Sequence, residues 1–145
     1  MRGDVDENLM NQRTKQNLIT AMKAEAFAQA KYARFAARAR MEEDWEAARV
    51  FQKAADSDST EHFAREAELA GLGAATEDNL RTAINEQSEQ AAMYRCFTDE
   101  ATADGESSAA AIFPHVQLQT DANRTELESC LRRLGPVVGC KIAKG

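Results

Sequence analysis

Residues 17–32 read NLITAMKAEAFAQAKY, and apolar side chains recur in this stretch at intervals of three and four positions. Such spacing places them on one face of an α-helix. The pattern continues in both directions and predicts a helix over residues 13–41. One carboxylate, that of Glu25, falls on the inward face of this helix. The other inward residues are Leu18, Met22, Gln29, Tyr32 and Ala36.

Three further segments, residues 45–70, 77–103 and 107–134, show the same periodicity. They are separated by short corners, which read EEDW, GLGAAT and DGESS. Pro114 is expected to kink the last helix or to mark a late start, because proline lacks a backbone N–H. Four long amphipathic helices with short corners predict an all-α protein, either an up-and-down bundle or a ferritin-like antiparallel four-helix bundle.

The bulk composition suits one soluble globular domain. The chain has 145 residues, of which 43% are hydrophobic and 29% are charged, and its net charge is −6. We expect a polar arm over residues 1–12, the bundle over 13–134 and a tail over 135–145. The sequence lacks a basic stripe with interleaved aromatic residues, so no nucleic acid is expected as a partner. No apolar run is long enough for a membrane span or typical of a secretory signal.

The three cysteines, Cys96, Cys130 and Cys140, form no CxxC pair. This spacing excludes a zinc ribbon and a rubredoxin-type iron site. An odd number of cysteines without a visible signal sequence predicts reduced thiols and a cytoplasmic location.

Polar side chains interrupt the apolar face in the middle of every predicted helix. Glu86 and Glu89 are three positions apart, a spacing that projects both carboxylates from one helix face. Buried carboxylates are costly unless a cation, a shared proton or water compensates their charge. A metal ion held by carboxylate oxygens and a histidine nitrogen would satisfy this polar layer. The layer comprises Glu25, Ser59, His62, Glu86, Glu89, Thr120 and Asn123.

From about residue 15 to 134, the chain resembles the rubrerythrin branch of the ferritin-like family. NLITAMKAEAFAQAKY is similar to the family's first-helix motif, and STEHFAREAELAGLG is similar to its second-helix ExxH segment. TEDNLRTAINEQSEQAAMY and ESSAAAIFPHVQLQTDAN are similar to the third and fourth helices. The resemblance implies a bundle that holds two irons, often reduces hydrogen peroxide, and is usually a homodimer with helices exchanged or closely packed. It also implies four metal ligands, namely Glu25, His62, Glu86 and Glu89.

The chain departs from the family at three of its seven ligand positions. Ser59, Thr120 and Asn123 replace two bridging glutamates and a histidine. Because three carboxylates nearly neutralise one divalent ion, we expect a mononuclear site at most. One histidine with two or three carboxylates suits iron, with manganese or zinc as alternatives.

The second predicted helix has two alternative registers. Alignment of Val50–Phe51 with Ile112–Phe113, as in an internal repeat, is one of them. Alignment on the EHF segment is the other, and it is preferred because it also keeps Leu69 inside. The first register places Asp58 and Glu61 at the site, and the second places Ser59 and His62 there.

Two functions are consistent with these patterns. The first is a rubrerythrin-like metal-binding protein, an oxidoreductase acting on peroxide or oxygen, with an electron donor that the sequence does not identify. The second is a non-catalytic ferritin-like scaffold or interaction module that binds no metal, in which His62 is protonated between glutamates. A homodimer is expected in both cases. The retained glutamates of the first and third helices favour the first function.

Overall fold

The computed structural model describes residues 10–57 and 61–135, with the exception of the side chains of Ser57 and Glu61. All regular structure in this part of the chain is helical, which confirms the all-α prediction. Most of the predicted arm and tail, together with Cys140, lies outside the described residues. The helices are α1 (Gln12–Met41), α2 (Trp45–Ser57), α3 (Glu61–Leu69), α4 (Thr76–Ala103) and α5 (Ser107–Leu134).

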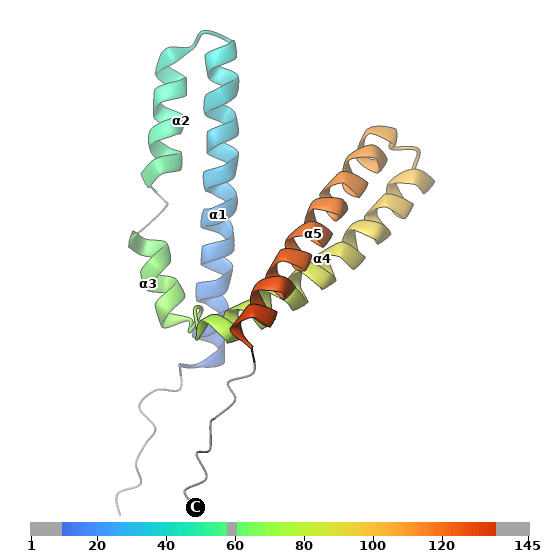
Figure 1. Cartoon of the computed structure of the whole chain (residues 1–145). Coiled ribbons are helices and arrows are strands. Elements are labelled where there is room, and N and C mark those ends of the chain that lie inside the picture. Colours follow the sequence, from blue (N-terminus) through green and yellow to red (C-terminus); the bar gives the residue numbers. More distant parts are fainter. Residues whose placement is uncertain (1–9, 58–60, 136–145) are drawn as a thin grey trace, which may run out of the picture. The chain divides into compact units, whose positions relative to one another are not determined.

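The helices form two hairpins, each of which is described by itself (Figure 1). In the first hairpin, α1 packs against α2 and α3. In the second hairpin, α4 packs against α5. The division falls between Gly73 and Ala74. Within each hairpin the helices run antiparallel, as the short corners predicted.

The predicted boundaries of three helices agree with the structure. α1, α4 and α5 begin within one residue of the positions expected from the sequence. The helix expected over residues 45–70 is instead described as two helices, α2 and α3, and residues 58–60 lie outside the description. Pro114 lies inside α5, well after its first residue, so the alternative of a late start is wrong.

The three corners end their preceding helices in the same way. At each corner, a backbone N–H donates to the carbonyl five residues earlier, as in the Schellman motif. The residue before this donor has a positive φ: 59° at Glu43, 70° at Gly71 and 73° at Gly105. The bonds run from Asp44 N to Ala39 O, from Leu72 N to Ala67 O and from Glu106 N to Ala101 O, at 2.9, 2.8 and 2.9 Å.

The interior of each hairpin is built mainly from alanine. Small side chains let two helices approach closely, but they bury little apolar area. Among the described residues, no large side chain is fully buried. Both hairpins also leave large apolar side chains exposed to solvent. The alanines are Ala36, Ala39, Ala48, Ala55, Ala70, Ala91 and Ala101, and the exposed apolar residues include Phe27, Trp45, Val50, Ile112 and Leu118.

The helices are amphipathic, and charged residues recur along each of them. None of the helices in the described part of the chain has the length and apolar character needed to cross a membrane.

Candidate functional site

Glu25 lies on the packed face of α1. Helical spacing places it on the same face as Met22 and Ala36, which are 3% and 0% exposed. Its side chain is half-buried, and its Oε2 atom is shielded from solvent. The carboxylate therefore occupies an inward position, and its role as a metal ligand stays a prediction.

A second carboxylate, that of Glu66, is partly buried in the same hairpin. Glu66 lies on α3, which packs against α1. Its Oε2 atom is shielded from solvent and has no hydrogen-bond partner among the described residues. Sequence reasoning did not include Glu66 among the ligands. The available signal was its spacing of four residues from His62, which places the two on neighbouring turns of one helix.

On α4, a glutamine rather than a glutamate occupies the packed face. Gln87 is half-buried, and its Oε1 atom is shielded from solvent without a hydrogen-bond partner in the described structure. Glu86 and Glu89 are exposed. Successive residues are about 100° apart around a helix, so neither neighbour shares the direction of Gln87. Glu86 lies instead on the side of α4 that carries Met93 and Phe97, which are 38% and 37% exposed.

The predicted histidine ligand, His62, is an exposed residue of α3. The two alternative registers of this region differ at Asp58 and Ser59, which both lie outside the described residues, as does the side chain of Glu61. Because α2 ends at Ser57 and α3 begins at Glu61, the structure describes no single helical register from residue 45 to 70.

Thr120 and Asn123 are hydrogen-bonded within α5 itself. Thr120 is 4% exposed, and its hydroxyl group donates to the Val116 carbonyl at 2.9 Å. The Asn123 side-chain carbonyl accepts from Gln119 Nε2 at 3.0 Å. Both residues are neutral, so this part of the polar layer carries no charge.

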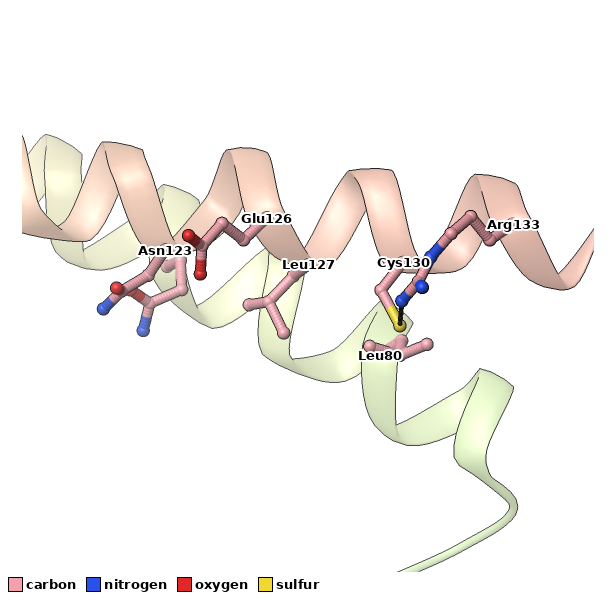
Figure 2. A pocket seen from close by; sticks show the side chains of 7 residues that line it. Leu80, Asn123, Glu126, Leu127, Cys130 and Arg133 are labelled. Atoms are coloured by element: carbon pink, nitrogen blue, oxygen red, sulfur yellow. Dashed lines mark hydrogen bonds between the residues drawn. The ribbon is translucent and has the colours of Figure 1, made fainter.

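An open groove of about 530 Å³ lies between α4 and α5 (Figure 2). Gln87 and Asn123 border it, one from each helix. Figure 2 also shows the Arg133 guanidinium against the Cys130 thiol, with Nη2 at 3.3 Å from Sγ. The groove is lined by Leu80, Gln87, Asn123, Glu126, Leu127, Cys130 and Arg133.

Neither hairpin gathers the four predicted ligands at one point. Glu25 and His62 belong to the first hairpin, and Glu86 and Glu89 belong to the second. Within the described ranges, no three or more His, Cys, Asp or Glu side chains are grouped so that they could hold one ion. The first hairpin holds two partly buried carboxylates, those of Glu25 and Glu66.

Comparison of the chain with protein-family models, curated proteins and solved structures found no significant match. The resemblance to rubrerythrins therefore stays a prediction that rests on the sequence motifs quoted above.

Proposed function

We propose that the chain is a rubrerythrin-like protein that binds a divalent metal ion through carboxylates of its first hairpin. The observation that supports this proposal is the partial burial of Glu25 and Glu66 on two helices that pack together. Each of these carboxylates has an oxygen shielded from solvent. Taking an ionised carboxylate out of water costs several kcal/mol unless a positive charge or hydrogen bonds compensate it. A bound cation would provide that charge for Glu66, whose Oε2 atom has no hydrogen-bond partner among the described residues.

The proposal includes a ferritin-like antiparallel four-helix bundle. Each hairpin buries mostly alanine and leaves large apolar side chains exposed, and a bundle would cover them. In this bundle His62, Glu86 and Glu89 are the predicted additional ligands. Only Glu25 of the predicted set is partly buried within its own hairpin, so the other three depend on the assembly for burial.

The proposal includes a homodimer, which the short connection between α3 and α4 supports if the bundle is ferritin-like. Ferritin-like bundles contain one long crossover that runs along the bundle. The residues from Leu69 to Thr76 span at most about 25 Å, whereas a 28-residue helix such as α4 is about 42 Å long. This connection is too short to run along the bundle as the crossover does. If two copies exchanged hairpins, each bundle would contain hairpins from different chains, and no crossover would be needed.

The metal would determine the chemistry of the site. Iron or manganese would supply redox chemistry when bound, and the resemblance extends the proposal to peroxide or oxygen as the substrate. The chain's own contribution would be to hold the ion and to limit access of water. The packed rings of Tyr32, Phe35 and Phe51 could serve the second purpose, because Tyr32 lies two helical turns from Glu25 on the same face.

Metal content per chain tests this proposal. Elemental analysis of protein purified without chelator is expected to find about one equivalent of iron, manganese or zinc per chain, because the carboxylates can balance the charge of only one divalent ion. Glu25→Gln and Glu66→Gln are expected to lose that metal. Glu68→Gln is the matched control, because Glu68 is exposed on the same helix as Glu66. Absence of metal from the parent, even after anaerobic loading with iron(II), would refute the proposal.

A second candidate is a metal-free dimeric scaffold. It is favoured by the neutral polar residues of the second hairpin, since Thr120 and Asn123 are hydrogen-bonded within α5. A ligand that binds only the folded state raises the unfolding midpoint. The scaffold predicts that removal of metal by a chelator leaves the thermal midpoint and the dimer unchanged, whereas the metal-binding function predicts a lower midpoint.

A further inference from the structure

A second groove, of about 490 Å³, lies on the first hairpin beside the corner that joins α1 to α2. Its volume falls within the range of about 300–1,000 Å³ that is typical of small-molecule sites. Most of its lining residues belong to one stripe of α2, because they recur at spacings of three and four positions. The most buried of them is Ala48, which is 5% exposed. The other lining residues are Arg40, Trp45, Arg49, Gln52, Lys53 and Asp56.

Three cationic side chains surround this groove without a carboxylate partner. Arg40, Arg49 and Lys53 form no ion pair with any described residue, whereas Arg38 is paired with a glutamate on α1. Arg49 and Lys53 are four positions apart on α2, a spacing at which like charges repel each other. The one carboxylate of the groove is that of Asp56. The groove is therefore locally positive in a chain whose net charge is −6.

Gln52 orients one of these cations. Its Oε1 atom accepts a hydrogen bond from Arg40 Nη2 at 2.9 Å, and this bond connects α1 with α2. Its Nε2 atom donates to Asp56 Oδ1 at 3.0 Å. Because a guanidinium has five N–H donors, the bond to Gln52 leaves most donors of Arg40 for a ligand.

The indole ring of Trp45 gives the groove a flat apolar surface. Trp45 is 67% exposed, and its ring contacts none of the other aromatic rings that the structure describes. It lies one helical turn before Arg49, so the ring and the guanidinium extend from the same face of α2. Arginine binds phosphate through directed hydrogen bonds, and an exposed aromatic ring stacks on nucleobases.

The second hairpin provides an internal comparison, because it repeats the sequence of the first at an offset of 62 residues. Residues that pack the hairpin are shared, such as Phe51 with Phe113 and Ala48 with Ala110. The cations and the indole are not shared, so the hairpin fold does not require them. The counterparts of Arg40, Trp45, Arg49 and Lys53 are Thr102, Ser107, Ala111 and His115.

We propose that this groove binds a free nucleotide, with the phosphate on the cationic side chains and the base on the indole of Trp45. A phosphate monoester carries close to two negative charges at neutral pH. Three cations and one carboxylate leave an excess of two positive charges, which matches that ligand. An acidic peptide would also satisfy the cations, but its carboxylates would give the indole no planar partner.

This proposal is independent of the proposed metal site. Arg40 follows Glu25 by 15 positions on α1, which separates them by about 22 Å along the helix. A nucleotide in the groove would therefore not reach a metal ion held at Glu25. Each of the two proposals can fail without the other.

Isothermal titration calorimetry of the full chain with adenosine monophosphate tests the proposal. Chelator-treated protein is used, so that a bound metal ion cannot hold the phosphate. Adenosine and inorganic phosphate are titrated separately. Adenosine monophosphate is expected to bind at least about tenfold more tightly than either part, because both contacts contribute to its binding free energy. Its affinity is expected to fall with added salt. Absence of binding at millimolar adenosine monophosphate would overturn the proposal.

Two substitutions separate the contacts. Arg49→Gln is expected to weaken binding of adenosine monophosphate and of phosphate by about tenfold. Trp45→Ala is expected to weaken binding of adenosine monophosphate and adenosine by about tenfold, and to leave phosphate binding unchanged. The matched controls are Arg65→Gln and Phe27→Ala, which remove an exposed arginine and an exposed ring elsewhere in the hairpin. Both controls are expected to bind as the parent does.

Thermal unfolding of each variant shows whether it is folded, and Lys53→Gln is a second test of the phosphate contact. If Arg49→Gln and Lys53→Gln both bind adenosine monophosphate as the parent does, the proposal is wrong. It is also wrong if Trp45→Ala binds as the parent does, or if a glutamate-rich peptide binds more tightly than adenosine monophosphate. A parent that contains no metal would refute the proposed function, but it would not change these titrations.

Discussion

Ala36 offers the most direct test of how the first hairpin packs. It is 0% exposed, and it lies on the face of α1 that also carries Met22 and Ala39. Ala36→Leu would add three carbon atoms where α1 approaches its packed neighbours. Leucine and alanine differ little in helix propensity, so the substitution changes packing and little else. Overpacking of this kind typically costs about 1–3 kcal/mol of the free energy of unfolding.

The matched control is Ala37→Leu, which adds the same atoms at the next, exposed position. Surface substitutions usually change the free energy of unfolding by less than about 0.5 kcal/mol. Thermal unfolding followed by far-ultraviolet circular dichroism is therefore expected to show a midpoint lower by about 3–9 °C for Ala36→Leu. The midpoint of Ala37→Leu should remain close to that of the parent.

A guanidinium titration checks that the loss is one of stability. The midpoint concentration should fall for Ala36→Leu while the slope of the transition stays constant, because the surface exposed on unfolding is nearly unchanged. Equal midpoints for the two variants would show that Ala36 does not lie at a helix contact, and would refute the packing described for α1.

Three further substitutions test local features. Gly71→Ala is expected to lower the free energy of unfolding by about 1–2 kcal/mol in a denaturant titration, because φ is +70° at this residue. No atom lies within 4 Å of the added Cβ, so the loss would come from backbone strain alone. An unchanged free energy of unfolding would contradict this backbone conformation. Asp44→Ala is expected to lower the free energy of unfolding by about 1 kcal/mol in the same titration, because Asp44 Oδ1 accepts a hydrogen bond from Ala47 N at 3.0 Å. Asp44→Asn is expected to retain most of that contribution. An equal loss for the two variants would argue against the helix cap. In metal-free protein, Gln87→Leu is expected to raise the thermal midpoint, because it removes an amide oxygen without a hydrogen-bond partner, which is worth about 1 kcal/mol of the free energy of unfolding. The exposed Gln90→Leu control is expected to leave the midpoint unchanged. A lower midpoint for Gln87→Leu would show that the amide has a partner.

Helix boundaries could be predicted from the sequence because local chemistry sets them. Gly71 and Gly105 adopt positive φ at helix ends, where a residue with a Cβ is strained. Asp44 accepts a hydrogen bond from the first turn of α2. These signals depend on a few neighbouring residues, so they can be recognised without knowledge of the tertiary structure.

The inward face of α4 could not be predicted in the same way. Glu86 and Gln87 are adjacent, and a difference of one residue rotates the face by about 100°. The spacing of Glu86 from Met93 and Phe97 favoured the glutamate, because all three share one stripe of the helix. In the structure Glu86 and Met93 are exposed, whereas the Phe97 ring packs against Phe113 of α5. The half-buried side chain is that of the next residue, Gln87. Which stripe packs depends on the partner helix, and sequence periodicity alone does not contain that information.

The second hairpin repeats the sequence of the first at an offset of 62 residues, so that Tyr32 corresponds to Tyr94 and Phe51 to Phe113. This repeat helps to explain why a metal site is proposed in the first hairpin. In the second hairpin, the counterpart of Glu25 is the neutral Gln87, and the counterpart of Glu66 has an arginine within 3.7 Å on its own helix. Negative charge on the packed faces is thus removed or compensated inside that hairpin. In the first hairpin, both positions retain a carboxylate, and an exposed histidine takes the place of the arginine. A divalent cation would supply positive charge beside Glu66, whose counterpart Glu128 has Arg124 on its own helix, and this difference between the hairpins is the physical basis for seeking metal there first.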